Sequence, residues 1–263
     1  METHMALFKG NNMNRLGIAG YGFVGQAHAQ IFEDYHQVLV NDPDKEHFAD
    51  LQHADAIIIC VATPPDNNGH CDFTNIVDVI NKAPDVPILI KSTISLEGWR
   101  YINQQYPNKD IAFSPEFLRA DHAFLDFKYC REILIGGKCV NFWQGLLLQA
   151  FGNINILHGD PEELILAKYF RNAFLATKVS FFNQIYDMCD ATSIDYDSVK
   201  KFITMDSRIG NSHTDVTTQR GYGGHCLPKD TLALTNTALN HNVKLSILDS
   251  TIDYNNTIRK DIT

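Results

Sequence analysis

The fold is decided by the stretch LGIAGYGFVG, residues 16–25. Residues 16–19 form an apolar run typical of a short buried strand, and a glycine-rich turn and a helical pattern follow. In this context the spacing G-x-G-x-x-G is typical of a dinucleotide-binding site, because the glycines allow a tight turn and close approach of a pyrophosphate to the helix N-terminus. The stretch therefore predicts a Rossmann-like domain with cofactor contacts at Gly20, Gly22, Phe23, Val24 and Gly25.

The next predicted strand covers residues 37–40 and ends at Asn41-Asp42. An acidic residue about 20 positions after the glycines accepts hydrogen bonds from the adenosine ribose, which favours NAD over NADP. Asp42 is therefore a candidate cofactor ligand. The alternative is a loop carboxylate that starts a turn before Pro43.

Further apolar runs lie at 56–62, 87–90, 111–113 and 132–135, with short helical segments between them. This alternation predicts an α/β fold with a mostly parallel sheet, in which ligand-facing residues lie just beyond the carboxyl ends of the strands. Small hydroxyls and one carboxylate occupy those ends: Thr63, Ser92, Thr93, Ser114 and Glu116. Each alone could be a helix cap or a turn former, but their recurrence favours a functional crevice.

The second half of the chain has a helical pattern. A long helix is predicted over 162–190, begun by Asp160-Pro161, and further helices over 196–205, 231–240 and 245–258. The sequence thus predicts a Rossmann-like NAD-binding domain over 13–158 and an all-helical domain over 159–263, entered by a long connecting helix. Residues 1–12 are polar and patternless, and we expect a disordered tail there.

Two polar residues of the long helix, Lys168 and Asn172, are four positions apart. At that spacing an amine and an amide share one helix face, about 5–6 Å apart. They are either functional donors or two polar residues on a solvated face.

A second glycine-rich loop, GYGGHCLPKD at 221–230, contains a cysteine and runs into a helix. Near a helix N-terminus, unpaired N–H groups favour a thiolate over a thiol, so Cys226 is a candidate nucleophile. The neighbouring His225 either activates the thiol or points away from it. Asp230 is expected to be the N-cap of the following helix, a role that does not exclude one in the chemistry.

Composition narrows the partners and the compartment. The 263 residues carry a formal net charge of -9, which argues against nucleic acid or an anionic membrane as the main partner. No apolar run reaches the roughly 18 residues of a membrane span, and no signal peptide precedes the first strand. The six cysteines show neither a CxxC pair nor zinc-like spacing, so we expect free thiols in a reducing cytoplasm and no metal site.

The motifs together resemble the UDP-glucose/GDP-mannose dehydrogenase family over about residues 15–259. They are GYGFVG, VATP, KSTIS, FSPEFLRA, REILIGG, KYFRNAFLATKVSFFNQI, SRIG and GYGGHCLPKD. The last motif looks most like that of the members that oxidise UDP-glucose to UDP-glucuronate. Gly-Gly-His-Cys also occurs in relatives that oxidise UDP-N-acetylhexosamines.

The resemblance implies a four-electron oxidation of a sugar C6 alcohol to a carboxylate with two NAD+ per turnover. Cys226 would attack the intermediate aldehyde, and the thiohemiacetal would lose a second hydride to give a thioester that water hydrolyses. Lys168 and Asn172 match the pair that stabilises the oxyanion, a task that needs fixed donors near the reacting carbon. Glu116 matches the carboxylate for proton transfer, Asp230 an aspartate that assists hydrolysis, and Thr93 the threonine that holds a catalytic water.

The same resemblance assigns binding residues and a partner. On the cofactor side it adds Thr63, Thr93 and Arg131 to the glycine motif and Asp42. Arg208 matches an arginine that reaches the partner subunit's sugar site, which implies a homodimer formed through the helical domain. The expected substrate contacts are Glu116, Phe117, Leu118, Lys168, Asn172, Arg208, Tyr222 and Gly223.

The sequence departs from the family pattern in three ways. It ends soon after Asn255, where the family continues into a domain that grips the nucleotide. Only residues 43–53 separate the second strand from the next, where the family has an insert with another strand and helix. Ala120 replaces a common glutamate, and the segment from Arg208 to the cysteine is slightly long. We expect a naturally compact version of the enzyme.

Several functions remain open at this point. The chain resembles a nucleotide-sugar 6-dehydrogenase, whose substrate could also be a UDP-N-acetylhexosamine or GDP-mannose. A beta-hydroxyacid or 6-phosphogluconate-type dehydrogenase shares the Rossmann domain and the lysine–asparagine helix but needs no cysteine. A catalytically weak NAD-binding regulator or heteromer subunit is the third reading.

Overall fold

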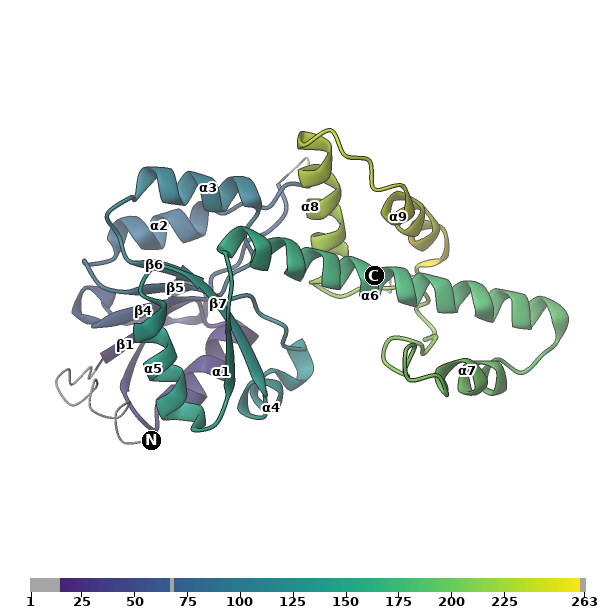
Figure 1. The fold of residues 1–263 in the computed structure, drawn as a ribbon, viewed down its shortest axis with the longest axis horizontal. Coiled ribbons are helices and arrows are strands. Elements are labelled where there is room, and N and C mark those ends of the chain that lie inside the picture. Colours follow the sequence, from purple (N-terminus) through teal and green to yellow (C-terminus); the bar gives the residue numbers. More distant parts are fainter. Residues whose placement is uncertain (1–14, 67–68, 261–263) are drawn as a thin grey trace. The chain divides into compact units, whose positions relative to one another are not determined.

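A computed structural model describes residues 15–66 and 69–260 (Figure 1). The predicted tail of residues 1–12 lies outside these ranges. The described residues form two compact units: unit 1 holds those up to Pro64 and from Cys71 to Lys168, and unit 2 holds those between Pro65 and His70 and from Tyr169 onward. Within the described ranges, no helix is long and apolar enough to cross a membrane.

Unit 1 is built on one eight-stranded sheet with the order β3-β2-β1-β4-β5-β6-β7-β8. Most neighbours are parallel; β3 on β2 and β7 on β6 are antiparallel. The predicted Rossmann-like, mostly parallel sheet is therefore confirmed. The strands are β1 (Arg15–Ala19), β2 (Gln37–Asp42), β3 (His47–Phe48), β4 (Ala56–Ile59), β5 (Ile88–Ile90), β6 (Ile111–Phe113), β7 (Glu132–Gly137) and β8 (Asn155–His158).

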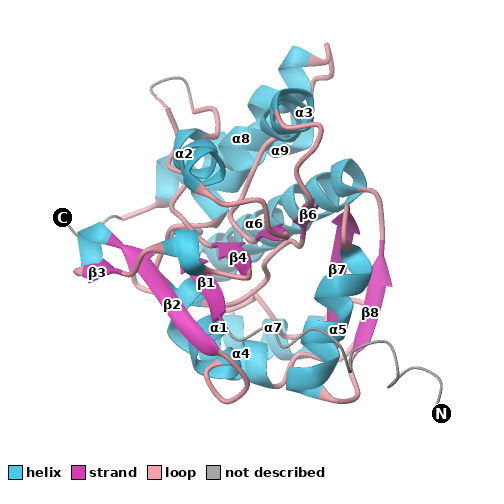
Figure 2. Cartoon of the chain, turned by 90° about the vertical axis from the view of Figure 1, so that its left-hand side faces the viewer, coloured by secondary structure: helices cyan, strands magenta, loops and turns pink. Residues whose placement is uncertain are grey.

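Helices cover both faces of this sheet (Figures 1 and 2). One face carries α2 (Thr74–Lys82) and α3 (Leu96–Gln105), and the other carries α1 (Phe23–Phe32), α4 (Ala123–Lys128) and α5 (Val140–Phe151). A strand buried on both faces needs apolar residues at successive positions, which is why Ile57, Ile58 and Ile59 are all at most 1% exposed. The core on the α1 side includes Phe127 and the fully buried Trp143.

Because β7 is antiparallel to β6, its first residue lies at the edge of the sheet where the parallel strands end. Gly136 pairs with Phe113, and Gly137 with Ala112, so β7 runs back along β6. Its start, preceded by Arg131, therefore lies toward the edge where β6 ends. The strand itself was predicted, but its direction was not.

Unit 2 is helical, as predicted. It holds most of α6 (Pro161–Thr192), together with α7 (Tyr196–Thr204), α8 (Leu227–Asn240) and α9 (Ser246–Ile258). The segment Pro65–His70 also belongs to it, and the tight space beside Gly69 is occupied by Leu232 of α8.

The start of α8 corrects one prediction. Asp230 is not an N-cap, because the helix begins at Leu227 and Cys226 occupies the N-cap position. Pro228 lies in the first turn, where a missing N–H removes no intrahelical hydrogen bond. The helix therefore starts before the proline, and Asp230 lies inside it with 1% exposure.

Candidate active site

The three glycines of the motif have different surroundings: Gly20 and Gly25 are packed against backbone atoms, whereas Gly22 faces open space. Gly20 has a φ of +89°, and a Cβ there would lie 2.6 Å from the carbonyl oxygen of Cys60. A Cβ on Gly25 would lie 2.0 Å from the carbonyl oxygen of Gly20, so both positions require glycine. A Cβ on Gly22, at the N-cap of α1, would meet no atom within 4 Å. The helix N-terminus thus has room for a phosphate group, as a dinucleotide requires.

Asp42 faces this turn. Its Oδ2 accepts a hydrogen bond of 2.6 Å from the backbone N–H of Tyr21. The backbone of Asp42 precedes a short 3-10 helix at Pro43–Lys45, but its side chain does not cap that helix. The carboxylate is therefore held beside the glycine turn, in the relation a ribose-binding residue requires.

Two of the serine hydroxyls at the strand ends are used in hydrogen bonds within unit 1. The Ser92 hydroxyl donates to the carbonyl of Val61 over 2.7 Å, which ties together the chain segments that follow β5 and β4. Ser114 Oγ lies 3.0 Å from the amine of Lys91, so it too is used inside unit 1. Thr63 is 7% exposed, and Arg131 is exposed.

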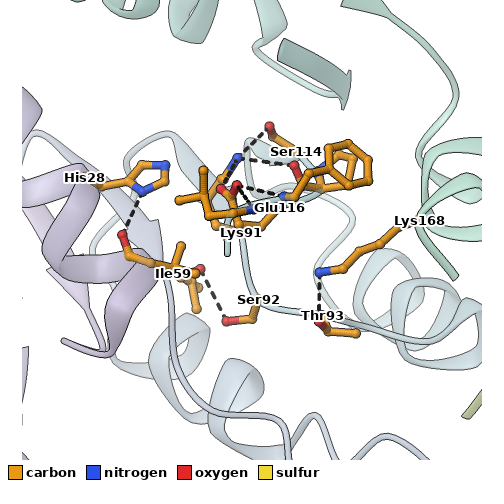
Figure 3. A network of polar contacts seen from close by, with 12 residues as sticks. His28, Ile59, Lys91, Ser92, Thr93, Ser114, Glu116 and Lys168 are labelled. Atoms are coloured by element: carbon orange, nitrogen blue, oxygen red, sulfur yellow. Dashed lines mark hydrogen bonds and ion pairs between the residues drawn. The ribbon is translucent and has the colours of Figure 1, made fainter. Parts of the chain in front are cut away.

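Thr93 and Lys168 come together (Figure 3). The ammonium group of Lys168 donates to the Thr93 hydroxyl over 2.8 Å. Lys168 is only 6% exposed although it belongs to a helix, so the reading of a solvated helix face does not describe it. A buried cation next to a hydroxyl can stabilise a developing oxyanion or hold a water molecule.

Glu116 lies in the same network of polar contacts in unit 1 (Figure 3). Its Oε1 accepts the backbone N–H groups of Phe117 and Leu118 at 2.8 and 3.2 Å, so these two predicted substrate contacts use their amides on Glu116. Its Oε2 lies 3.0 Å from Nζ of Lys91. Burial opposes ionisation, but the charge of Lys91 and the hydrogen bonds outweigh it and hold the pKa of Glu116 below its ordinary value.

Two residues of this network were not found from the sequence. Lys91 follows the apolar run of β5, and His28 lies between two alanines in α1. His28 places Nδ1 2.8 Å from the carbonyl oxygen of Val24 and stacks on Phe127 with ring centroids 4.1 Å apart. Burial, followed by the charge of Lys91, lowers the pKa of His28 to about 4. The only sequence signal was a charged or polar residue within an apolar element.

In unit 2, Asn172 donates to Oδ2 of Asp230 over 2.6 Å, and Lys229 lies 2.7 Å from Oδ1. Asn172 and Asp230, which were predicted separately, therefore contact each other directly. Cys226 is half-buried at the N-cap of α8, one helical turn before Asp230. Cys226 thus lies at the N-terminal end of α8, where the helix has unpaired backbone N–H groups.

Side-chain amides fix the loop that carries Cys226. Asn183 of α6 accepts the N–H of Gly221 at 3.1 Å. Asn255 of α9 accepts the N–H of Tyr222 at 2.7 Å and donates to its carbonyl at 3.1 Å. Gly221 has a φ of +54°, and a Cβ there would lie 2.2 Å from Oδ1 of Asn255. The glycine therefore permits both the backbone conformation and the close contact.

The remaining predicted contacts have simpler surroundings. The Arg208 side chain is 88% exposed and forms an ion pair of 2.5 Å with Asp206. Tyr222 is 5% exposed, and burial raises its pKa. The six cysteines form no disulfide, and the described residues contain no cluster of three metal-ligating His, Cys, Asp or Glu side chains.

A glycine turn with room at a helix start, and an aspartate held beside it, define unit 1 as a dinucleotide-binding domain. Comparison with known proteins agrees. Residues 46–143 match the NAD binding domain of the UDP-glucose/GDP-mannose dehydrogenase family, and residues 163–257 match its central domain. The chain belongs to this family.

Individual relatives are similar over most of this chain. It is 33% identical to UDP-glucose 6-dehydrogenase of Rickettsia felis over 221 residues, 78% of this chain and 48% of that enzyme. A UDP-glucose dehydrogenase structure from Pyrobaculum islandicum superimposes with a TM-score of 0.80 at 24% identity, over 95% of this chain and 69% of that one. A 3-hydroxyisobutyrate dehydrogenase structure from Mycobacterium tuberculosis superimposes with a TM-score of 0.70 at 16% identity, over 93% of this chain and 94% of that one.

The structural and the sequence comparisons support different conclusions. The structural matches, at less than 25% identity, show the fold alone. The chain spans about half the length of the curated relatives it matches.

Proposed function

We propose that the chain oxidises the C6 alcohol of a nucleotide sugar to the carboxylate, as in the conversion of UDP-glucose to UDP-glucuronate, using NAD. The observation that carries the proposal is the position of Cys226 at the start of α8, in a loop fixed by two asparagines. The hydrogen-bonded Asn172 and Asp230 support it, because a nucleophile needs nearby donors and a group to manage protons.

NAD, held by the glycine turn and Asp42, supplies the hydride acceptor when it is bound. In the first step the C6 alcohol loses a hydride and a proton and becomes an aldehyde. The Thr93 hydroxyl, or a water held by it, takes part in moving that proton. The ammonium of Lys168, 2.8 Å from this hydroxyl, stabilises negative charge on the sugar oxygen.

Cys226 then forms a C–S bond to the aldehyde carbon, giving a thiohemiacetal. Loss of a second hydride from that carbon gives a thioester. Water attacks the thioester, the C–S bond breaks, and the carboxylate and the thiolate are released. Asn172 donates to the oxyanion, and Glu116 and Asp230 handle the protons of the water. Two NADH form per sugar.

The experiment is a panel of UDP- and GDP-sugars incubated with NAD+ and the purified chain. The absorbance of NADH gives its yield per sugar consumed. The proposal expects two NADH and one uronate for each nucleotide sugar, and the panel identifies which sugar is used. If the chain binds NAD in calorimetry but oxidises none of these sugars, the proposal is wrong and a catalytically weak NAD-binding regulator is favoured.

A beta-hydroxyacid dehydrogenase is the second candidate. Its support is the fold: this chain covers 94% of the 3-hydroxyisobutyrate dehydrogenase chain. This reaction needs no cysteine and gives one NADH per substrate. A yield of one NADH from a small hydroxyacid, unchanged in Cys226→Ser, would favour it.

We also propose that the protein is a homodimer formed through α6. Phe174, Phe181 and Met188 are seven residues apart and 67, 58 and 65% exposed, so they form one apolar stripe on the helix. We propose that a second copy of this chain covers the stripe. The family resemblance supports this choice, because Arg208 matches an arginine that reaches the sugar site of the partner subunit. Sedimentation should give a dimer for the wild type and a monomer for Phe181→Glu, while a wild-type monomer would contradict the proposal.

The rest of the proposal concerns place and organisation. We place the protein in the cytoplasm, as its thiols and negative charge suggest. We assign NAD binding to residues 13–158, and dimerisation with the cysteine chemistry to residues 159–263.

A further inference from the structure

Lys91 lies directly after β5 with its side chain 4% exposed. Its Nζ has three neighbours: Glu116 Oε2 at 3.0 Å, Ser114 Oγ at 3.0 Å and the carbonyl oxygen of Pro115 at 3.4 Å (Figure 3). The amine donates hydrogen bonds to Ser114 Oγ and to the Pro115 carbonyl, and it forms an ion pair with Glu116. These three contacts fix the orientation of the amine.

Glu116 is equally fixed. One carboxylate oxygen accepts two backbone N–H groups, and the other faces the Lys91 ammonium. With 9% of the side chain exposed, water contributes little to its solvation. A buried carboxylate without a counter-charge would bind a proton or destabilise the fold, so its ionised state depends on its neighbours.

The other ionisable groups around Glu116 are His28 from α1, Cys60 after β4 and Cys130 before β7. Burial lowers the pKa of His28 to about 4 and raises the pKa of both thiols, so all three are neutral at pH 7. The cavity beside Lys91 and His28 has a volume of about 10 Å³, room for roughly one water.

We propose that Lys91 is the positioning residue of this site: its ammonium group holds Glu116 as a fixed anion, so that Glu116 enters the reaction as a proton acceptor. This rests on the proposed function, in which Glu116 handles a proton. During thioester hydrolysis, water forms the new C–O bond and gives its proton to Glu116, while the C–S bond breaks and the Cys226 thiolate leaves. A protonated Glu116 could not accept that proton.

The first test follows the titration of Glu116 without turnover. The carboxyl signal of Glu116 in ¹³C NMR, assigned by its absence from Glu116→Gln, is followed against pH in the wild type and in Lys91→Met. We expect the titration midpoint to rise by at least about one pH unit in Lys91→Met, a tenfold gain in proton affinity. An unchanged midpoint would overturn the inference.

Lys109→Met is the matched control. The amine of Lys109 donates to the carbonyls of Ala83 and Pro84, at 2.9 and 3.2 Å, and contacts no carboxylate. The Lys109→Met variant lacks a partly buried lysine of the same unit, but its Glu116 should titrate at the same pH as in the wild type. A shift as large as that in Lys91→Met would show that any lysine loss has this effect, against the proposal.

We expect Lys91→Met to be less stable than the wild type, so a second measurement uses stability itself as the readout. Urea unfolding of Lys91→Met, Glu116→Gln and the double variant forms a cycle. If Lys91 acts on the charge of Glu116, the double variant resists urea better than Lys91→Met does. Equal or lower resistance of the double variant would mean that Lys91 is needed for packing alone.

Turnover separates this inference from the proposed function. In Lys91→Met the pH below which the rate of uronate formation falls should rise together with the NMR midpoint, whereas a merely structural defect would lower the rate without moving this pH. If no nucleotide sugar is oxidised but the NMR shift is present, the proposed function fails and the effect of Lys91 on Glu116 stands. If the wild type forms uronate and the NMR midpoint does not move, the reverse holds.

Discussion

Protonation of His28 should destabilise unit 1 in mild acid. The residue is 2% exposed and its ring packs on Phe127. Burial, followed by the Lys91 charge, lowers the pKa of His28 from 6.5 to about 4. The folded state therefore binds a proton less readily than the unfolded chain does. This contribution to stability is intact above pH 6.5 and is lost as the pH falls toward 4.

The shift sets the size of the effect. At pH 5 the unfolded imidazole is almost fully charged, while the folded one is mostly neutral. Between pH 7 and pH 5 the free energy of unfolding should therefore fall by about 2 kcal/mol through His28 alone. His28→Phe removes the titration and keeps an aromatic ring against Phe127. We expect the drop from pH 7 to pH 5 to be smaller by that amount in the variant.

Tryptophan fluorescence during urea unfolding is a suitable assay. The chain has two tryptophans, and both lie in unit 1: Trp99 is 3% exposed and Trp143 is 0% exposed. His158→Gln is the control, because it removes an exposed histidine from the same unit. If His28→Phe loses as much stability as the wild type between pH 7 and pH 5, the account of His28 is refuted.

Further predictions concern the two glycine loops. Gly22→Ala should leave the unfolding temperature nearly unchanged but weaken NADH binding at least tenfold in calorimetry, because its Cβ meets no protein atom and occupies the space meant for the pyrophosphate. Gly25→Ala should also lose roughly 2–4 kcal/mol of stability, since its Cβ would lie 2.0 Å from a backbone oxygen; equal effects of the two variants would contradict this assignment. Asn255→Leu should speed amide hydrogen exchange at Tyr222 and cost about 2–4 kcal/mol in unit 2, because a buried N–H and carbonyl lose their partner; the exposed Asn256→Leu serves as control, and unchanged exchange in Asn255→Leu would count against the anchor.

Features that depend on a few consecutive residues were predictable from the sequence. The strand, turn and helix of residues 16–25 follow from local backbone requirements, and the structure confirms them. The long helix was also predicted, because its apolar pattern and its Asp160-Pro161 start are local. The direction of β7 depends on pairing with β6, which no local pattern encodes. Strand β8, NILH, has no apolar run long enough to be noticed.

Burial is the part of the site that the sequence does not encode directly. Glu116 was chosen for its place after a strand, but its partner Lys91 was overlooked, because a lysine after an apolar run usually faces solvent. His28 was overlooked for a similar reason. Asp230 was predicted to be an N-cap, but the helix begins at Leu227 and Pro228 lies within its first turn. Its contact with Asn172 depends on packing between two helices far apart in sequence.

The covalent intermediate on Cys226 is the most direct test of the proposed function. Turnover with a substrate from the sugar panel is quenched in acid, and the tryptic peptide of residues 221–229, in which Cys226 is the one cysteine, is weighed by mass spectrometry. The account predicts a mass increase equal to the nucleotide-sugar acyl group, greater in Asp230→Asn, where hydrolysis is slowed, and no uronate from Cys226→Ser. Wild-type rates of uronate formation by Cys226→Ser, with no adduct on the wild-type peptide, would contradict it.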